Sequence, residues 1–217
     1  MEVVFLSNYY THHQKPFSEQ MFVQTNGDYI FFETAKMDQE RIDMGWGIKK
    51  PEYVKNFYDN EKENKKILDQ ASCVIFGSAP FGLIKTRIKE GKLTFKYSER
   101  PLKKGIELHK YIPRLIKWNF QFKNAKSLYL LCASAYTASD YRKFGLFKKK
   151  AFKWGYFPEC KEYDNVSDLI ESKERNSILW CGRFLSWKHP ELAIDVAKCL
   201  KADRYNFRLN IIGTGVN

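Results

Sequence analysis

The chain has 217 residues and is 44% apolar, so it is long enough for one large or two small domains with a buried core. Its net charge of +12 is concentrated in residues 85–153, which carry 19 Lys and Arg against 4 Asp and Glu. This basic region favours anionic partners: phosphorylated ligands, anionic lipid or nucleic acid. Because no apolar stretch is long enough to cross a bilayer and the N-terminus does not resemble a signal peptide, we expect a protein that does not span a membrane.

The five cysteines indicate the compartment. Their number is odd, and no pair has CxxC spacing. Such usage is typical of proteins in a reducing environment. We therefore expect a cytoplasmic location, with peripheral attachment to the inner face of the plasma membrane as an option that the basic region leaves open.

Short apolar runs alternate with amphipathic segments along the chain. Val, Ile, Phe and Tyr cluster between turn residues, which predicts strands at 2–6, 29–33, 73–76, 93–97, 127–132, 151–154, 178–181 and 208–212. The intervening segments predict helices at 17–26, 52–70, 80–90, 104–122, 136–144 and 189–201. Several strands are apolar throughout, as expected for a sheet covered on both faces. The alternation predicts an α/β fold with a Rossmann-like parallel sheet.

A polar, acidic stretch interrupts this alternation and predicts a domain boundary. We expect a first domain over 1–160, a linker over 161–176 and the start of a second domain over 177–217. This last part contains one β-α-β unit, which is too small to be stable by itself. Either the chain is truncated or the unit docks onto the first domain.

The segment 178–190 carries the most specific pattern in the chain. An apolar strand ends at Gly182, the cations Arg183 and Lys188 follow, and a helix begins near Pro190. A helix N-terminus offers free N–H groups and the positive end of the helix dipole, and the two cations add mobile charge. The pattern indicates a diphosphate-binding site. The alternative is an ordinary strand-to-helix connection with solvated cations.

Two loops that follow other predicted strands contain further candidates. In an open parallel sheet, ligands bind beyond the carboxyl ends of the strands. His12, His13 and Lys15 follow the first strand and are candidates for substrate contact, the alternative being a solvent-exposed polar loop. Ser78 could contact substrate, but its position before Pro80 favours a helix cap. We expect no metal site, because no Cys or carboxylate lies at ligand spacing from the two histidines.

The stretch 98–126 combines a strand end with a basic amphipathic segment. Glu99 and Arg100 are either site residues or a surface ion pair. The segment 100–126 interleaves basic with apolar and aromatic residues, which suits an anionic membrane surface. The alternative is a helix whose aromatic residues, such as Trp118, face the core while its basic face is solvated. Pro113 predicts a kink or a restart of this helix.

Residues 178–215 resemble the start of the nucleotide-binding domain in retaining GT-B glycosyltransferases of glycosyltransferase family 4 (group 1). The resemblance rests on the strand, Gly182-Arg183, Lys188 after four intervening residues, a helix, and a second strand ending in Ile212-Gly213-Thr214-Gly215. It implies that Arg183 and Lys188 contact the pyrophosphate of the donor, with Gly182 and Gly213 shaping the binding turns. His189 stands where the family commonly has Gly.

The resemblance extends less specifically into the first domain. It places Ser98, Glu99 and Arg100 at the strand end that faces the sugar, where many members carry His, and so makes them the catalytic candidates. It implies transfer from a nucleoside-diphosphate sugar to a lipid-linked or polysaccharide acceptor in cell-surface polysaccharide biosynthesis, without a cofactor. The family's Glu-x7-Glu donor element cannot be assigned, so we expect this chain to be inactive alone.

Two rival functions remain on the sequence alone. The basic, aromatic region could bind single-stranded nucleic acid by phosphate contacts and base stacking. No recognition helix, zinc pattern or RNA-reading strand is visible, so we expect no nucleic-acid partner. The chain could also be a non-catalytic fragment that binds only the acceptor or the membrane.

Overall fold

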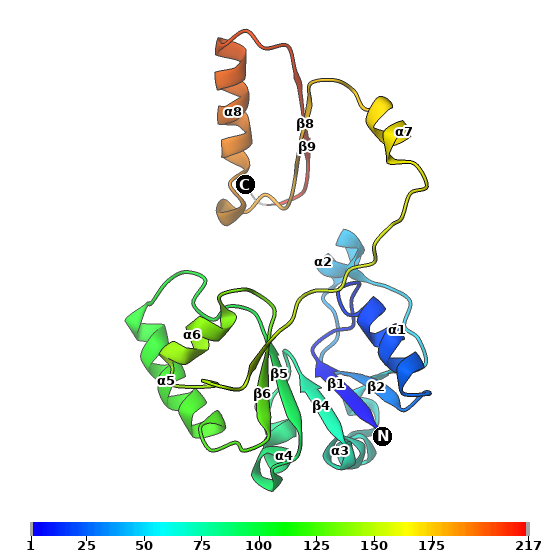
Figure 1. Ribbon diagram of the computed structural model, residues 1–217, viewed down its shortest axis with the longest axis vertical. Coiled ribbons are helices and arrows are strands. Elements are labelled where there is room, and N and C mark those ends of the chain that lie inside the picture. Colours follow the sequence, from blue (N-terminus) through cyan, green and yellow to red (C-terminus); the bar gives the residue numbers. More distant parts are fainter. Residues whose placement is uncertain (1, 216–217) are drawn as a thin grey trace. The chain divides into compact units, whose positions relative to one another are not determined.

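The structure is a computed structural model that describes residues 2–215. The chain forms two compact units, Met1–Cys160 and Lys161–Asn217, which are described separately below (Figure 1).

The first unit is built on a parallel seven-stranded sheet in the order β3-β2-β1-β4-β5-β6-β7. The strands are β1 Val3–Ser7, β2 Tyr29–Glu33, β3 Val54–Asn56, β4 Cys73–Phe76, β5 Thr94–Ser98, β6 Leu128–Cys132 and β7 Ala151–Lys153. From β1 the chain first adds strands on one side and then, from β4 onward, on the other. The strand order therefore reverses between β1 and β4, and ligands of such sheets bind in the crevice at the carboxyl end of this reversal.

Helices cover both faces of this sheet. They are α1 Lys15–Gln24, α3 Glu61–Gln70, α4 Lys85–Glu90, α5 Leu108–Phe122 and α6 Thr137–Lys143, with the shorter turns α2 Gln39–Arg41, η1 Ile42–Trp46, η2 Phe57–Asn60 and η3 Phe81–Ile84. Side chains of α1 pack on one face, and those of α3, α5 and α6 pack on the other. This two-sided cover is the arrangement that the continuously apolar strands predict.

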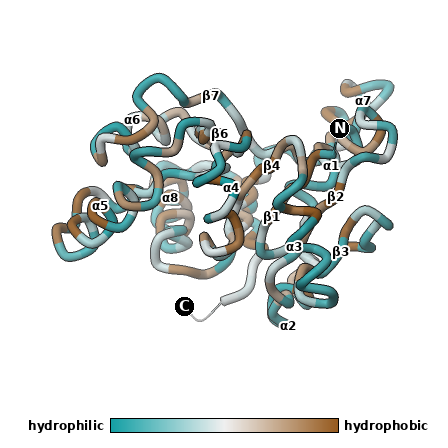
Figure 2. Tube along the Cα trace, turned by 90° about the horizontal axis from the view of Figure 1, so that it is seen from below, coloured by the Kyte–Doolittle hydropathy of each residue, from teal (hydrophilic) through white to brown (hydrophobic). Residues whose placement is uncertain are grey.

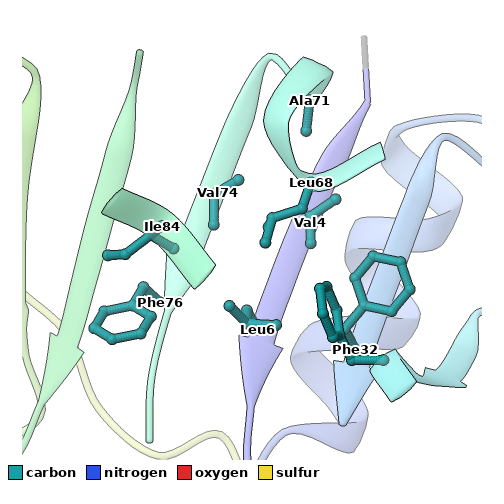
Figure 3. Packing of buried hydrophobic residues seen from close by; sticks show 9 residues of the cluster. Val4, Leu6, Phe32, Leu68, Ala71, Val74, Phe76 and Ile84 are labelled. Carbon is teal, nitrogen blue, oxygen red and sulfur yellow. The ribbon is translucent and has the colours of Figure 1, made fainter. Parts of the chain in front are cut away.

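Alternate residues of each central strand enter different clusters of the core. In β1, Val4 and Leu6 face the cluster under α3, which Figure 3 shows, whereas Val3 and Phe5 face α1. All four are buried. This burial on both faces fixes the register, because a slip of one residue would exchange the two sets of side chains.

The predicted helix over 52–70 is wrong in its first half. Val54–Asn56 forms the edge strand β3 beside β2, η2 follows, and α3 begins only at Glu61. The Asn56 side chain accepts a hydrogen bond from the Tyr58 amide at 2.9 Å and thereby caps η2. Tertiary pairing with β2 outweighs the local helical pattern here.

The helix does not restart at Pro113. Helix α5 begins at Leu108, later than predicted, and runs through Pro113 to Phe122 as one element. Pro113 is the sixth residue of the helix, so the ring removes only one intrahelical hydrogen bond, that to His109. Both residues are exposed, so the freed carbonyl faces solvent.

The second unit is a β-α-β arrangement preceded by a short helix. Its elements are α7 Val166–Glu171, β8 Ser177–Cys181, the turn η4 Ser186–Lys188, α8 Pro190–Ala202 and β9 Arg208–Ile212. β8 and β9 pair in parallel over their whole length. The acidic segment 161–176 contains α7, which the sequence pattern did not predict and which Asn165 caps by accepting from the Ser167 amide at 2.9 Å.

Candidate functional site

A cavity of about 750 Å³ opens at the carboxyl edge of the first unit's sheet. It lies where the strand order reverses, because residues that follow β1, β4 and β5 line it together. Its volume falls in the range of small-molecule binding sites. Of the predicted site residues, five line this cavity: His13, Ser78, Ser98, Glu99 and Arg100.

The turns after β1 and β4 approach each other closely on the cavity floor. A Cβ built on Gly77 would lie 2.9 Å from the Ser7 Oγ atom, which is too close for a side chain. Ser78 follows with an exposed side chain. The predicted capping role of Ser78 is wrong: η3 begins at Phe81 with Pro80 at the N-cap, and no side chain caps it.

The loop after β1 brings one histidine into the cavity and turns its neighbour aside. His13 stacks on His12 at 4.1 Å between ring centroids and lies near Trp46 and Tyr156. The His13 Nδ1 atom is buried without a hydrogen-bond partner among the described residues. Desolvation, with a smaller contribution from His12, lowers the pKa of His13 below its usual 6.5. His13 is therefore neutral at pH 7 and can accept a hydrogen bond.

His12 and Lys15 do not line the cavity. His12 packs edge-on against Trp46 at 5.5 Å. Lys15 begins α1 and lies 3.4 Å from Glu159 and 3.8 Å from Glu19. Its charge is thus partly compensated by carboxylates of the same unit.

The end of β5 contributes the three catalytic candidates, each held by a neighbour. Ser98 Oγ lies 2.9 Å from the Tyr141 hydroxyl and donates to the Glu99 carbonyl. The Glu99 carboxylate pairs with Lys103 and accepts a hydrogen bond from the Tyr156 hydroxyl. Among these three residues, the carboxylate of Glu99 is the only acidic group.

Arg100 is fixed by a buried carboxylate. Its Nε and Nη2 atoms donate to the two oxygens of Asp140 at 3.0 and 3.3 Å, and its guanidinium lies over the Tyr136 ring. The Leu102 amide donates to the same carboxylate. Asp140 is 1% exposed, so this pair anchors the loop after β5 to α6. Such a forked pair fixes geometry as well as charge.

Lys96 is a cavity residue that sequence reasoning missed. It lies in β5 in register with Phe76, and its ammonium sits 5.0 Å from the Phe76 ring centre and 5.7 Å from that of Phe122. Burial lowers the pKa of Lys96 to about 8. The available signal was a lone lysine between the aromatic residues Phe95 and Tyr97 of a predicted strand.

Arg41 and Arg114 are two further cations on the cavity wall. Arg41 stacks over Tyr9 and Trp46, and the Arg114 guanidinium donates to the Pro101 carbonyl at 3.0 Å. They come from segments far from β5 in sequence, so no local pattern could assign them. The lining therefore holds four Lys and Arg side chains against the single carboxylate of Glu99.

The second unit places the other predicted cations between β8 and α8. Arg183 and Lys188 are both exposed, and neither forms an ion pair within residues 2–215. Helix α8 has no side-chain cap. Its N-cap residue His189 has φ 51°, the left-handed conformation that glycine adopts most readily.

The two glycine turns of this unit fit against each other. The Gly182 amide donates to the Ile212 carbonyl at 3.0 Å, so pairing continues beyond the strands. A Cβ on Gly213 would lie 1.8 Å from the Gly182 carbonyl oxygen, so only glycine fits there. Gly213 therefore shapes the turn that carries Arg183.

Helix α5 exposes a row of apolar side chains. Leu108, Ile112, Ile116 and Phe120 follow each other at intervals of four residues, and each is at least half exposed. Hydrophobic and hydrophilic positions alternate along this helix (Figure 2). Trp118 instead packs inward on Tyr141 at 5.2 Å. The core-facing alternative for Trp118 is thus the one observed.

The described part of the chain contains neither a candidate metal site nor a candidate membrane-spanning helix. Across residues 2–215, no group of three or more His, Cys, Asp and Glu side chains could hold a metal ion. Within the same range, none of the helices has both the length and the apolar composition that crossing a bilayer requires.

Comparison with known proteins identifies the fold. No protein-family model and no curated protein matches this sequence. Among solved structures, an alpha-glucosyltransferase (AGT) in complex with UDP matches with a TM-score of 0.52 and 9% identity, over 98% of this chain and 67% of its own. An alpha-glucosyltransferase in complex with UDP and a 13-mer DNA containing a HMU base matches with a TM-score of 0.50 and 10% identity, over 99% of this chain and 66% of its own.

This chain thus spans about two thirds of the length of those two structures. At such low identity the likeness concerns the fold alone. The predicted fold class is confirmed: a Rossmann-like parallel sheet followed by a second, smaller parallel sheet, as in the GT-B glycosyltransferases.

Proposed function

We propose that this chain belongs to a retaining glycosyltransferase of the family 4 type, which moves a sugar from a nucleoside-diphosphate donor. The observation that carries the proposal is the pair Arg183 and Lys188, exposed and without ion-pair partners among the described residues, between β8 and the uncapped N-terminus of α8. Two cations beside the positive end of a helix dipole suit a diphosphate, and they would stabilise it as the leaving group. The donor part of the site thus lies in the second unit.

The cavity of the first unit is the proposed acceptor side. His13 is neutral at pH 7 and can accept a hydrogen bond from an acceptor hydroxyl. Ser98, Glu99 and Arg100 surround the same space at the end of β5. The donor-domain resemblance and this polar cavity at a strand-order reversal together support the transferase assignment.

UDP binding measured by calorimetry tests the donor site. We expect Arg183→Ala and Lys188→Ala each to weaken the binding free energy of UDP by about 1.5–3 kcal/mol, as for a hydrogen bond to a charged group. Lys201→Ala, in the last turn of α8, is the matched control and should leave the affinity unchanged. Equal UDP affinity in all variants, or no UDP binding to the unsubstituted chain, would remove the donor assignment.

We further propose that the acceptor is lipid-linked or a growing polysaccharide, and that α5 holds the protein on the cytoplasmic surface of an anionic membrane. The specific observation is the row of exposed apolar side chains on α5, together with the exposed Lys110 and Lys117 on the same helix and Lys123 at its end. Apolar side chains insert between lipids, and each nearby cation contributes about 1 kcal/mol toward an anionic surface.

Vesicle sedimentation tests this surface. Binding should require phosphatidylserine or phosphatidylglycerol, fall with salt, and be lost in Ile116→Ser/Phe120→Ser, two exposed positions. Trp118→Phe is the control, since Trp118 faces the core. Equal binding to neutral vesicles would contradict the proposal. Tighter binding of single-stranded DNA than of vesicles at physiological salt would instead favour a nucleic-acid acceptor.

A further inference from the structure

Lys96 is the one cation of the cavity wall whose charge is not compensated by polar groups. Arg100 is neutralised by Asp140, Arg41 lies 3.8 Å from Asp38, and Arg114 donates to a carbonyl. The Lys96 ammonium has no hydrogen bond and no ion pair within residues 2–215, only the faces of two aromatic rings. A half-buried charge without a polar partner is costly, and it is available to an anionic ligand.

The position of Lys96 directs this charge into the cavity. Its side chain is partly exposed and lines the cavity on the sheet face covered by α5. Lys96 pairs in register with Phe76, the last residue of the neighbouring strand β4. Ser78, two residues after Phe76, is exposed. Thus an ammonium and a free hydroxyl border the same space at the carboxyl edge of neighbouring strands.

The balance of charge indicates which anion fits. Of the four lining cations, Arg100 and Arg41 are paired with Asp140 and Asp38, and the lining carboxylate of Glu99 is engaged by Lys103. The excess positive charge is therefore that of Lys96 and Arg114. A group with two negative charges and several acceptor oxygens compensates this excess better than a singly charged carboxylate. A lysine ammonium, as a compact point charge with three donors, is well suited to phosphate.

We infer that the cavity binds a phosphate group of the acceptor against Lys96, so that the acceptor of the proposed transfer is a phosphorylated molecule. That the bound molecule is the acceptor rests on the proposed function. That the cavity binds a phosphate group rests on the cavity alone. Removal of Lys96 should therefore weaken phosphate binding and leave the second unit's nucleotide binding intact.

Calorimetry with inorganic phosphate and with glycerol 3-phosphate, combined with thermal unfolding, tests the inference. Lys96→Met should weaken the binding of both ligands at least tenfold. It should also raise Tm, because an apolar side chain replaces an unpartnered charge. Lys96→Arg should retain binding. Lys89→Met, exposed on α4, is the control and should change neither quantity.

The outcomes separate the inference from the proposed function. Unchanged phosphate affinity in Lys96→Met, or a lower Tm without loss of affinity, would overturn the phosphate site. Glucuronate binding as tightly as glycerol 3-phosphate would overturn the choice of phosphate. A parallel loss of UDP affinity in Lys96→Met would assign the site to the donor instead. If UDP fails to bind while phosphate depends on Lys96, the proposed function fails and the phosphate site stands.

Discussion

Each of the two edges of the first unit's sheet holds a cation, Arg87 fully buried and Lys96 half-buried, and the two cations have different partners. At the amino edge, the fully buried Arg87 donates to the carbonyls of Leu68, Asp69, Ala71 and Leu93, which close the end of α3 onto the start of β5. At the carboxyl edge, Lys96 contacts only aromatic rings and faces a cavity. A cation satisfied by the protein's own carbonyls stabilises the fold, whereas one left without such partners is available to a ligand.

The largest expected effect is at the amino edge. Arg87→Met should destabilise the first unit by at least about 3 kcal/mol, because it leaves buried carbonyls without donors. Denaturant unfolding measures this loss, and phosphate affinity in the folded protein should be unchanged. A variant as stable as the unsubstituted protein would break the comparison, since the carbonyls around Arg87 would then contribute nothing to the fold.

A smaller loss is expected where the turns after β1 and β4 meet. Gly77→Ala places a methyl group 2.9 Å from Ser7 Oγ and should cost about 1–3 kcal/mol, as overpacking does. Adding Ser7→Ala removes the closest atom and should recover part of the stability. Additive losses in the double variant would show that the two turns are not in contact.

Alkaline pH sharpens the contrast between the two cations. The pKa of Lys96 is lowered to about 8, against 10.5 in an exposed lysine, so the unfolded chain binds more protons between these values. The Lys96 contribution to stability is therefore unfavourable below pH 8 and improves as pH rises toward 10.5. The free energy of unfolding, compared between the unsubstituted protein and Lys96→Met across this range, should show a difference that shrinks with pH.

Other titratable groups line the same cavity as Lys96: Tyr9, His13, Arg41, Tyr97, Glu99, Arg100, Arg114, Tyr141 and Tyr156. All of them are present in both proteins and cancel in the comparison. A pH-independent difference would mean that Lys96 titrates as an exposed lysine.

Acidic pH gives the smallest expected effect. The pKa of His13 is lowered from 6.5 by burial, so the unfolded chain binds more protons just below pH 6.5. The His13 contribution to stability is complete above pH 6.5 and is lost as pH falls through its folded pKa. His13→Gln should flatten this acid limb of the unfolding free energy, while His109→Gln, an exposed residue outside the cavity, serves as the control.

The sequence by itself determined the fold class and most strands, because continuously apolar runs such as 3–6 and 128–132 are typical of strands covered on both faces. It also determined the glycine turns of the second unit, since Gly213 allows a backbone contact that no side chain permits. His13, Ser78 and the end of β5 were located as strand-end residues, and the structure brings them to one cavity.

Only the tertiary structure decided the rest, because it depends on partners distant in sequence. The edge strand β3 exists through pairing with β2, against the helical pattern of its own segment. Arg87 stands between Thr86 and Ile88, and Lys96 between Phe95 and Tyr97, and no local pattern predicts the partners of either cation. The carbonyls gathered around one and the aromatic rings around the other come from other elements, and these surroundings decide which cation serves the fold and which faces a ligand.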